Sequence, residues 1–250
     1  MKPALLLATF GAAALLALAD ARAAEAPLQP FSAEYATLRN GSEAGRTTLT
    51  LTANDDGSWT LVSDTRGTAG LARLAGIQVV ETTRLRWNDG RPEALDYSYR
   101  QDGLKKRSRR GEFDWAAGQV RMEENGRQAT YAIVPGLIDR QTVTLAIAAD
   151  LSQGARAFDY KVAVKDHVED MRYSRVGEES VRVPAGAFDA VLMQRERAPG
   201  AELKRVSQSW FAPSIGWLPV KIEQAEKKGD TITLELVSFS RPGSESKAKD

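Results

Sequence analysis

The chain has 250 residues, of which 34 are Lys or Arg, 33 are Asp or Glu, one is His and none is Cys. The absence of cysteine excludes disulfides, thiolate metal sites and a cysteine nucleophile, and the single histidine excludes the histidine pairs that zinc hydrolases use. The formal net charge of +1 gives no overall attraction to nucleic acid, so we expect no nucleic-acid partner, and binding to any other anionic surface requires a local patch.

Residues 1–23 have the pattern of a secretory signal peptide. Lys2 precedes a mostly apolar run over residues 4–19, and Ala21 and Ala23 are the small residues that a signal peptidase requires. This run of about 16 residues is shorter than the roughly 20 apolar residues of a membrane-spanning helix. We predict cleavage near Ala23 and a periplasmic protein that does not span the membrane. Because the chain has no cysteine, we expect a soluble protein rather than a lipoprotein.

From Phe31 onward the sequence predicts antiparallel strands joined by hairpins. Apolar and polar residues alternate in short segments, as around Phe31, Ala33 and Tyr35, which is typical of a sheet with one buried face. About 13 such segments are separated by sequences that favour tight turns. These turns are Asn40-Gly41, Asp56-Gly57, Asp89-Gly90, Asp102-Gly103, Asn125-Gly126, Pro184-Ala185-Gly186 and Gly229-Asp230. We expect a mainly β fold, either a large curved antiparallel sheet or an open barrel of hairpins.

Two segments lack this alternation and are the expected helical parts. Residues 67–76 predict a short helix or a loop that packs Leu71 and Leu74 on the sheet. Residues 139–152 predict the one longer helix, with Asp139 as the cap of its first turn. We expect this helix to cover one face or one end of the sheet.

Five cations stand close together at Lys105, Lys106, Arg107, Arg109 and Arg110. On a strand, Lys105, Arg107 and Arg109 face one way and the other two face the opposite way, so this strand is not expected at the centre of a core. One interpretation is an edge strand or protruding hairpin whose charges discourage pairing with another chain. The alternative is a patch for anionic lipid headgroups, lipopolysaccharide phosphates or acidic glycans.

Few residues are candidates for catalysis. His167 lies in a polar stretch that indicates a turn, where a solvated residue is favoured over a catalytic base. Paired carboxylates of the kind that glycosidases use would have to meet in a cleft, yet the acidic clusters all fall at turns or strand ends. These clusters are Asp55 with Asp56, Glu123 with Glu124, residues 166–170, and Glu178 with Glu179. We predict no catalytic residues, no metal site and no cofactor.

Two longer motifs stand in the C-terminal half. Residues 181–191 predict two strands around a Pro-Ala-Gly turn, and residues 209–220 predict another hairpin. Trp210 and Trp217 flank the second turn, where they either stack across the strand pair, form a platform for a sugar or lipid, or lie buried in the core.

These two motifs resemble those of the DUF3108 family, which occurs in exported proteins of Gram-negative bacteria. The resemblance extends over nearly the whole mature chain and includes five further segments. They are residues 31–35, 56–59, 90–92, 113–115 and 149–154. The resemblance implies a β-rich periplasmic domain without established activity and without catalytic residues to carry over. It also implies a likeness, at the level of fold alone, to curved-sheet proteins that handle lipids or lipoproteins.

The sequence favours one β-rich domain over residues 24–240, because no linker rich in Pro, Gly or Ser divides it. The alternative is two β halves that meet at the central helix. Residues 241–250 are polar and predict a disordered tail.

We expect a non-catalytic periplasmic protein that binds or shields an apolar or amphipathic envelope ligand, such as a lipid or a lipoprotein. The first alternative is a scaffolding partner of an envelope complex, and the second is a carboxylate-dependent polysaccharide hydrolase. The candidate ligand-binding residues are Lys105, Lys106, Arg107, Arg109, Arg110, Trp210 and Trp217.

Overall fold

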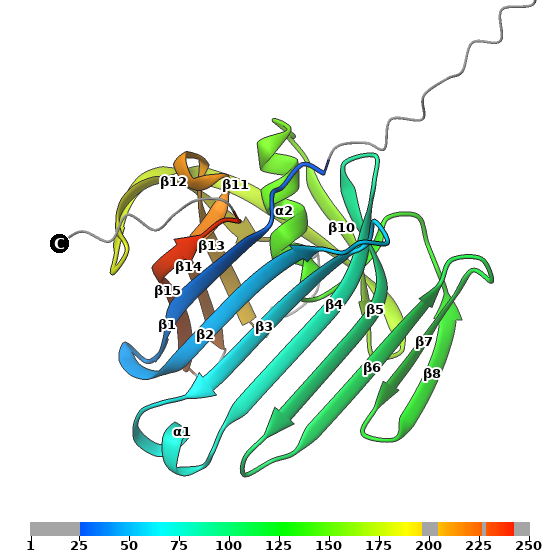
Figure 1. Cartoon of the computed structure of the whole chain (residues 1–250), viewed down its shortest axis with the longest axis horizontal. Coiled ribbons are helices and arrows are strands. Elements are labelled where there is room, and N and C mark those ends of the chain that lie inside the picture. The colour runs from blue at the N-terminus through cyan, green and yellow to red at the C-terminus, as the bar shows by residue number, and fades with distance from the viewer. Residues whose placement is uncertain (1–25, 197–204, 227–228, 243–250) are drawn as a thin grey trace, which may run out of the picture.

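A computed structural model describes residues 26–196, 205–226 and 229–242 (Figure 1). The predicted signal peptide lies outside these residues, as does the predicted tail beyond residue 242. The N-terminal strands are β1 (Phe31–Arg39), β2 (Ser42–Ala53), β3 (Trp59–Gly67), β4 (Gln78–Asn88), β5 (Arg91–Asp102), β6 (Arg107–Asp114), β7 (Gln119–Glu124) and β8 (Arg127–Ala132). The C-terminal strands are β9 (Leu137–Asp139), β10 (Phe158–Val164), β11 (His167–Val183), β12 (Gly186–Arg195), β13 (Arg205–Ala212), β14 (Leu218–Glu226) and β15 (Thr231–Ser240). The helices are α1 (Gly70–Leu74), α2 (Thr142–Ser152) and the 3-10 turn η1 (Pro213–Ile215).

All of these strands form one open sheet in the order β8-β7-β6-β5-β4-β3-β2-β1-β15-β14-β13-β12-β11-β10-β9. The first and last strands therefore pair in its middle, and the chain runs outward from them to the edges at β8 and β9. Neighbouring strands are antiparallel except β9 and β10, which are parallel. The predicted class, a mainly β fold built on a curved antiparallel sheet, is confirmed.

The Asn-Gly and Asp-Gly turns form as their sequences predict. Asn40 and Gly41 have φ angles of 52° and 76°, and Asp89 and Gly90 have 48° and 75°. These positive angles suit a two-residue hairpin, whose twist matches that of the flanking strands. The carbonyl of Gly90 also accepts a hydrogen bond from the side chain of Gln153 at 3.0 Å, so this turn holds the C-terminal end of α2.

The two ends of the sheet meet through side chains. Leu137 of β9 and Ala163 of β10 share a buried cluster with Tyr97 of β5 and residues of β6 and β7. The Tyr131 hydroxyl of β8 donates to the carbonyl of Val164 at 2.8 Å. Among the described strands no backbone hydrogen bonds join β8 to β9. The sheet therefore curls until its two ends touch, but its edge strands do not pair to close a barrel.

Helix α2 lies inside this curve rather than over an outer face (Figure 1). Nine of its eleven residues are buried, which is typical of a helix enclosed on all sides. Asp139 caps it as predicted, because its carboxylate accepts from the backbone N–H of Gln141 at 2.8 Å and from both the N–H and the hydroxyl of Thr142. The predicted start at residue 139 is three residues early, since Leu137–Asp139 forms β9.

The edge-strand interpretation of the cationic segment is wrong. Strand β6 is hydrogen-bonded to β5 on one side and to β7 on the other. It tolerates charge on its inward face because Arg109 forms an ion pair with Glu124 of β7 at 2.5 Å. Only Lys105 and Lys106 lie in the turn before the strand.

The short helix predicted in residues 67–76 exists as α1, but its predicted packing is wrong. Leu71 and Leu74 are 83% and 78% exposed. The backbone of this segment is fixed by hydrogen bonds to the strand ends beside it, and both leucine side chains project away from the sheet.

Candidate ligand pocket

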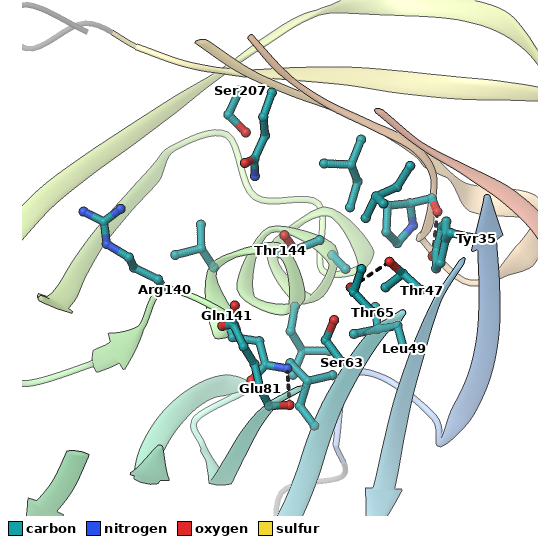
Figure 2. Close-up of a pocket in the computed structure, with 18 of the residues that line it drawn as sticks. Tyr35, Thr47, Leu49, Ser63, Thr65, Glu81, Arg140, Gln141, Thr144 and Ser207 are labelled. Carbon is teal, nitrogen blue, oxygen red and sulfur yellow. Dashed lines mark hydrogen bonds between the residues drawn. The ribbon is translucent and has the colours of Figure 1, made fainter. Parts of the chain in front are cut away.

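A cavity of about 740 Å³ lies between α2 and the concave face of the sheet (Figure 2). Strands from both halves of the sheet contribute to it, because the curl brings β1–β3 opposite β11 and β14. Small-molecule sites occupy roughly 300–1,000 Å³ and combine an apolar wall with a few polar groups, so the cavity has the size of a ligand pocket.

Hydroxyl groups form a continuous row across one wall. The Thr37 and Thr47 hydroxyls are 2.8 Å apart, and the Thr47 and Thr65 hydroxyls are also 2.8 Å apart. All three residues face inward, because alternate side chains of a strand share a face. Thr47 of β2 is the register partner of Thr65 of β3, whereas Thr37 of β1 lies diagonally from Thr47, since the partner of Thr37 is Gly45. Ser63 extends the polar strip along β3 (Figure 2).

Apolar side chains fill the rest of the same wall. Leu49, Leu61, Ile222 and Leu234 line the cavity beside the hydroxyl row. Tyr35 lies among them with its hydroxyl donating to the carbonyl of Pro219 at 2.9 Å, and burial raises the pKa of this phenol. A ligand here would therefore meet a surface that is apolar along most of its length and carries hydroxyls along one line.

Glu81 of β4 is an acidic residue that lines the cavity close to the start of α2. The Tyr97 hydroxyl donates to its carboxylate at 3.3 Å, and the side chain of Gln141 donates to its backbone carbonyl at 3.2 Å. Burial, and then the negative charge of Asp139, raise the pKa of Glu81 to about 7. Both protonation states of this carboxyl are consequently populated near neutral pH.

Cations gather on the side of the cavity formed by β6 and β11. Arg140 and Arg195 both bind the carboxylate of Glu169, at 3.0 and 2.5 Å. Arg109 binds Glu124 through one terminal nitrogen, but its buried Nε has no hydrogen-bond partner among the described residues. Arg107 makes neither an ion pair nor a hydrogen bond with any described side chain. This side of the cavity thus offers unmatched positive charge.

A second hollow, about 480 Å³, adjoins these cations. Arg107, Arg127 and Lys165 line it together with Asn125 and the single carboxylate of Glu124. Arg107 and Lys165 also line the larger cavity, so the two hollows share a cationic boundary.

The structure brings three of the seven predicted binding residues to the larger cavity. Arg107, Arg109 and Trp217 line it. Arg110 is exposed on the opposite face of β6, and Lys105 and Lys106 are exposed in the preceding turn.

Trp210 lies outside the lining of the cavity. It is 7% exposed, its indole N–H donates to Glu179, and the Lys221 ammonium lies 4.7 Å from its ring centroid. In the part of the chain that the structure describes, no ring contact joins it to Trp217, which packs at the rim of the core.

Only some residues of the predicted acidic clusters lie in the site. Glu124 and Glu169 reach the two hollows, whereas Asp56 stays in an exposed turn. His167 is the first residue of β11 and lines the larger cavity, but its side chain is largely exposed and is hydrogen-bonded to Asp166 at 2.7 Å. The sequence analysis did not identify Glu81 as a site residue. Glu81 shares the inward face of β4 with Thr83 and Leu85, and a charged residue on an inward face is itself an indication of a functional site.

Two kinds of feature are absent from the described residues. No helix is both long and apolar enough to cross a bilayer. No three side chains of the His, Cys, Asp or Glu type come together where they could hold a metal ion.

Residues 31–237 match the model of a family described as protein of unknown function (DUF3108). No curated protein matches the sequence. A β-barrel-like protein of the domain of unknown function DUF1849 from Brucella abortus has a similar structure, with a TM-score of 0.53 and 10% identity over 86% of this chain and 98% of that one. Two other structures are less similar. MucB has a TM-score of 0.31 and 12% identity, over 88% of this chain and 55% of that one. A protein from Bacteroides fragilis, described as a putative exported protein with a YmcC-like fold, has a TM-score of 0.36 and 15% identity, over 87% of this chain and 97% of that one. The first likeness supports the curled, barrel-like fold.

Proposed function

The chain belongs to the DUF3108 family of proteins of unknown function, and we propose that it binds an anionic amphiphile of the cell envelope in the cavity beside α2. The apolar part of the ligand lies between the helix and the sheet, and its anionic head lies at Arg107 and Arg109. The protein acts in the periplasm, where the predicted signal peptide would deliver it, and shields this ligand from water.

The observation that carries the proposal is the mixed lining of the cavity. Leu49, Leu61 and Ile222 offer apolar surface, the burial of which contributes about 25 cal/mol per Å². The threonine row beside them can bond to ester or hydroxyl groups of a ligand without requiring charge. These hydroxyls bond to one another, and an entirely apolar ligand would add no partner for their remaining lone pairs, so an amphiphile suits the wall better.

The cations at this side of the cavity favour a negative head group. The Arg107 guanidinium has no carboxylate partner among the described residues, and the buried Arg109 Nε lacks an acceptor. A phosphate or carboxylate can accept two hydrogen bonds from a guanidinium in its plane, and such charge-assisted bonds are roughly twice as strong as neutral ones.

A binding role suits these side chains better than hydrolysis does. Glycoside hydrolysis needs two carboxyl groups that face each other across the bond to be cleaved. Among the lining carboxylates, Glu169 is held between two arginines and Glu124 between Arg109 and Lys165. Glu81 is thereby left without a free carboxylate as its partner.

Native mass spectrometry of protein purified from periplasm tests the proposal, together with organic extraction of the same sample. We expect a bound species whose mass and fragments identify an acyl chain with an acidic head. A fluorescent fatty acid should also bind to the delipidated protein and be displaced by the extract. If the sample carries no bound lipid and the fatty acid fails to bind, the proposal is wrong.

Replacing Arg107 with glutamine is expected to weaken the binding of a long-chain fatty acid by about tenfold, the equivalent of ~1.4 kcal/mol, because one charge-assisted contact is lost. Binding of the uncharged monoglyceride with the same chain should change little. Fluorescence displacement measures both affinities. Arg110→Gln is the matched control, since it removes the same charge from the outward face of the same strand. Equal losses in the two variants would contradict the assignment of the head group.

A further inference from the structure

We propose that α1 and the turn between β5 and β6 form a docking tip for an anionic lipid bilayer. The docking tip consists of Leu71, Arg73, Leu74, Leu104, Lys105 and Lys106. This surface is separate from the pocket lining, and the inference does not depend on the identity of the pocket ligand.

Three leucines of the docking tip are almost fully exposed. Leu71, Leu74 and Leu104 have exposed fractions of 83%, 78% and 86%, the highest among the exposed large apolar residues described. Single exposed leucines are common on protein surfaces, but three in adjoining segments form an apolar projection that water solvates poorly.

The two segments lie directly against each other. A Cβ atom placed on Gly103 would lie 3.0 Å from the carbonyl oxygen of Ala75 and 3.3 Å from the Cα of Ile77, so the β5–β6 turn touches the residues that follow α1. Figure 1 shows α1 and this turn at the same lower edge of the sheet.

The leucines project from a defined backbone. The N–H of Gly67 bonds to the carbonyl of Ile77 at 2.8 Å, and the N–H of Ile77 bonds to the carbonyl of Ala72 at 3.1 Å. These bonds tie α1 to the ends of β3 and β4. The backbone of α1 is thus fixed by hydrogen bonds, and in this fixed conformation its leucine side chains point outward.

The charges around the leucines complement an anionic surface. Arg73, Lys105 and Lys106 make no ion pair with a described residue. The nearby carboxylates of Asp64 and Asp102 are already bound to arginines, at 2.8 and 3.2 Å. Lysine and arginine keep their charge at the level of the headgroups while leucine enters the acyl boundary, and this pairing is the usual pattern of an interfacial anchor.

A bilayer fits the docking tip better than a protein partner does. The apolar part consists of only three leucine side chains, whereas a stable protein interface buries about 800 Å² on each partner. The docking tip also adjoins pocket residues, because Thr65, Tyr99 and Arg107 line the cavity at the strand ends that meet the β3–α1 and β5–β6 connections. Docking through this edge would place that end of the pocket beside the membrane.

Flotation of residues 24–250 with phosphatidylglycerol vesicles tests the inference, with phosphatidylcholine vesicles for comparison. We expect the wild type to float with the anionic vesicles at low salt. The triple variant Leu71→Ser, Leu74→Ser, Leu104→Ser should bind at least about tenfold more weakly, since its apolar insertion is lost. The pair Lys105→Gln, Lys106→Gln should weaken binding to anionic vesicles by roughly fivefold per lysine removed.

The matched control is Val176→Ser, which removes an exposed apolar side chain from β11. It should float as the wild type does, and the thermal transitions of the variants should agree closely because the changed side chains are mostly exposed. If the triple variant does not fold, the lysine pair alone decides the test. The inference is wrong if the wild type does not float, if the control loses as much binding as the triple variant, or if the docking tip crosslinks to an envelope protein while vesicles leave the wild type unbound.

Discussion

Replacing Glu81 with glutamine is expected to raise the free energy of unfolding at pH 8 by about 2–3 kcal/mol. The pKa of Glu81 rises from its ordinary 4.5 to about 7 because the folded protein buries the carboxyl near Asp139. Between these two values the unfolded chain has released the proton and the folded chain still holds it, so the stability of the wild type falls by ~1.4 kcal/mol per pH unit. Glutamine does not titrate and escapes this loss.

The expected result is a difference in how the free energy of unfolding depends on pH. Wild type and Glu81→Gln should have similar stability near pH 4 and diverge up to pH 7, after which the difference stays constant. Urea unfolding at several pH values measures it. Parallel profiles from pH 4.5 to 8 would contradict the prediction.

Asp56→Asn serves as the control, because the pKa of Asp56 is shifted in the opposite direction to that of Glu81. Hydrogen bonds from Ser58, and then the contact with Arg84, lower the pKa of Asp56 to about 2. The stability that this carboxylate contributes is present above pH 4 and is lost as the pH falls toward 2. Asp56→Asn should therefore follow the wild type in parallel between pH 4.5 and 8, the interval in which Glu81→Gln diverges.

Filling the pocket is expected to have the largest effect on binding. In the double variant Ser63→Phe, Thr144→Phe, one phenyl ring enters from β3 and another from α2, toward the space that the ligand would occupy (Figure 2). Excluding about 100 Å² of apolar ligand surface from the wall corresponds to ~2.5 kcal/mol, or roughly 70-fold weaker binding. Titration with the fluorescent fatty acid measures the loss.

The matched control for the pocket variant is Ser98→Phe, which adds the same ring to the outward face of β5. It should bind the fatty acid as the wild type does. Circular dichroism establishes that each variant is folded, and Ser63→Phe alone replaces the double variant if that one is not. Full binding by a folded, pocket-filled protein would place the ligand elsewhere and overturn the proposed function.

The sequence predicted the local elements well because their signals are local. Asn40-Gly41 and Asp89-Gly90 specify their turns through backbone φ preferences, and Asp139 specifies a helix start through its carboxylate. The inside position of α2 was not predictable in this way. Its enclosure depends on how far the sheet curls, and the curl results from strands distant in the chain.

The same limit applies to the pocket. Alternation along β6 correctly separates Arg107 and Arg109 from Arg110, yet it does not show which face is enclosed. That depends on β9 and β10 crossing over the inner side of the N-terminal strands, where Leu137 joins the cluster of Tyr97. Glu81 was missed for the same reason, since its significance comes from burial rather than from its neighbours in the sequence.

The pairing of the first strand with the last also delays completion of the sheet during folding. Ser32 lies opposite Ser240, and Arg39 lies opposite Ile232, so the middle of the sheet joins residues from the two ends of the described fold. Contacts of such long sequence separation slow folding. Until β15 pairs with it, the outer edge of β1 is unpaired and can recruit strands from other chains. A chain in which β15 has not yet docked therefore carries an aggregation-prone edge in the middle of its sheet.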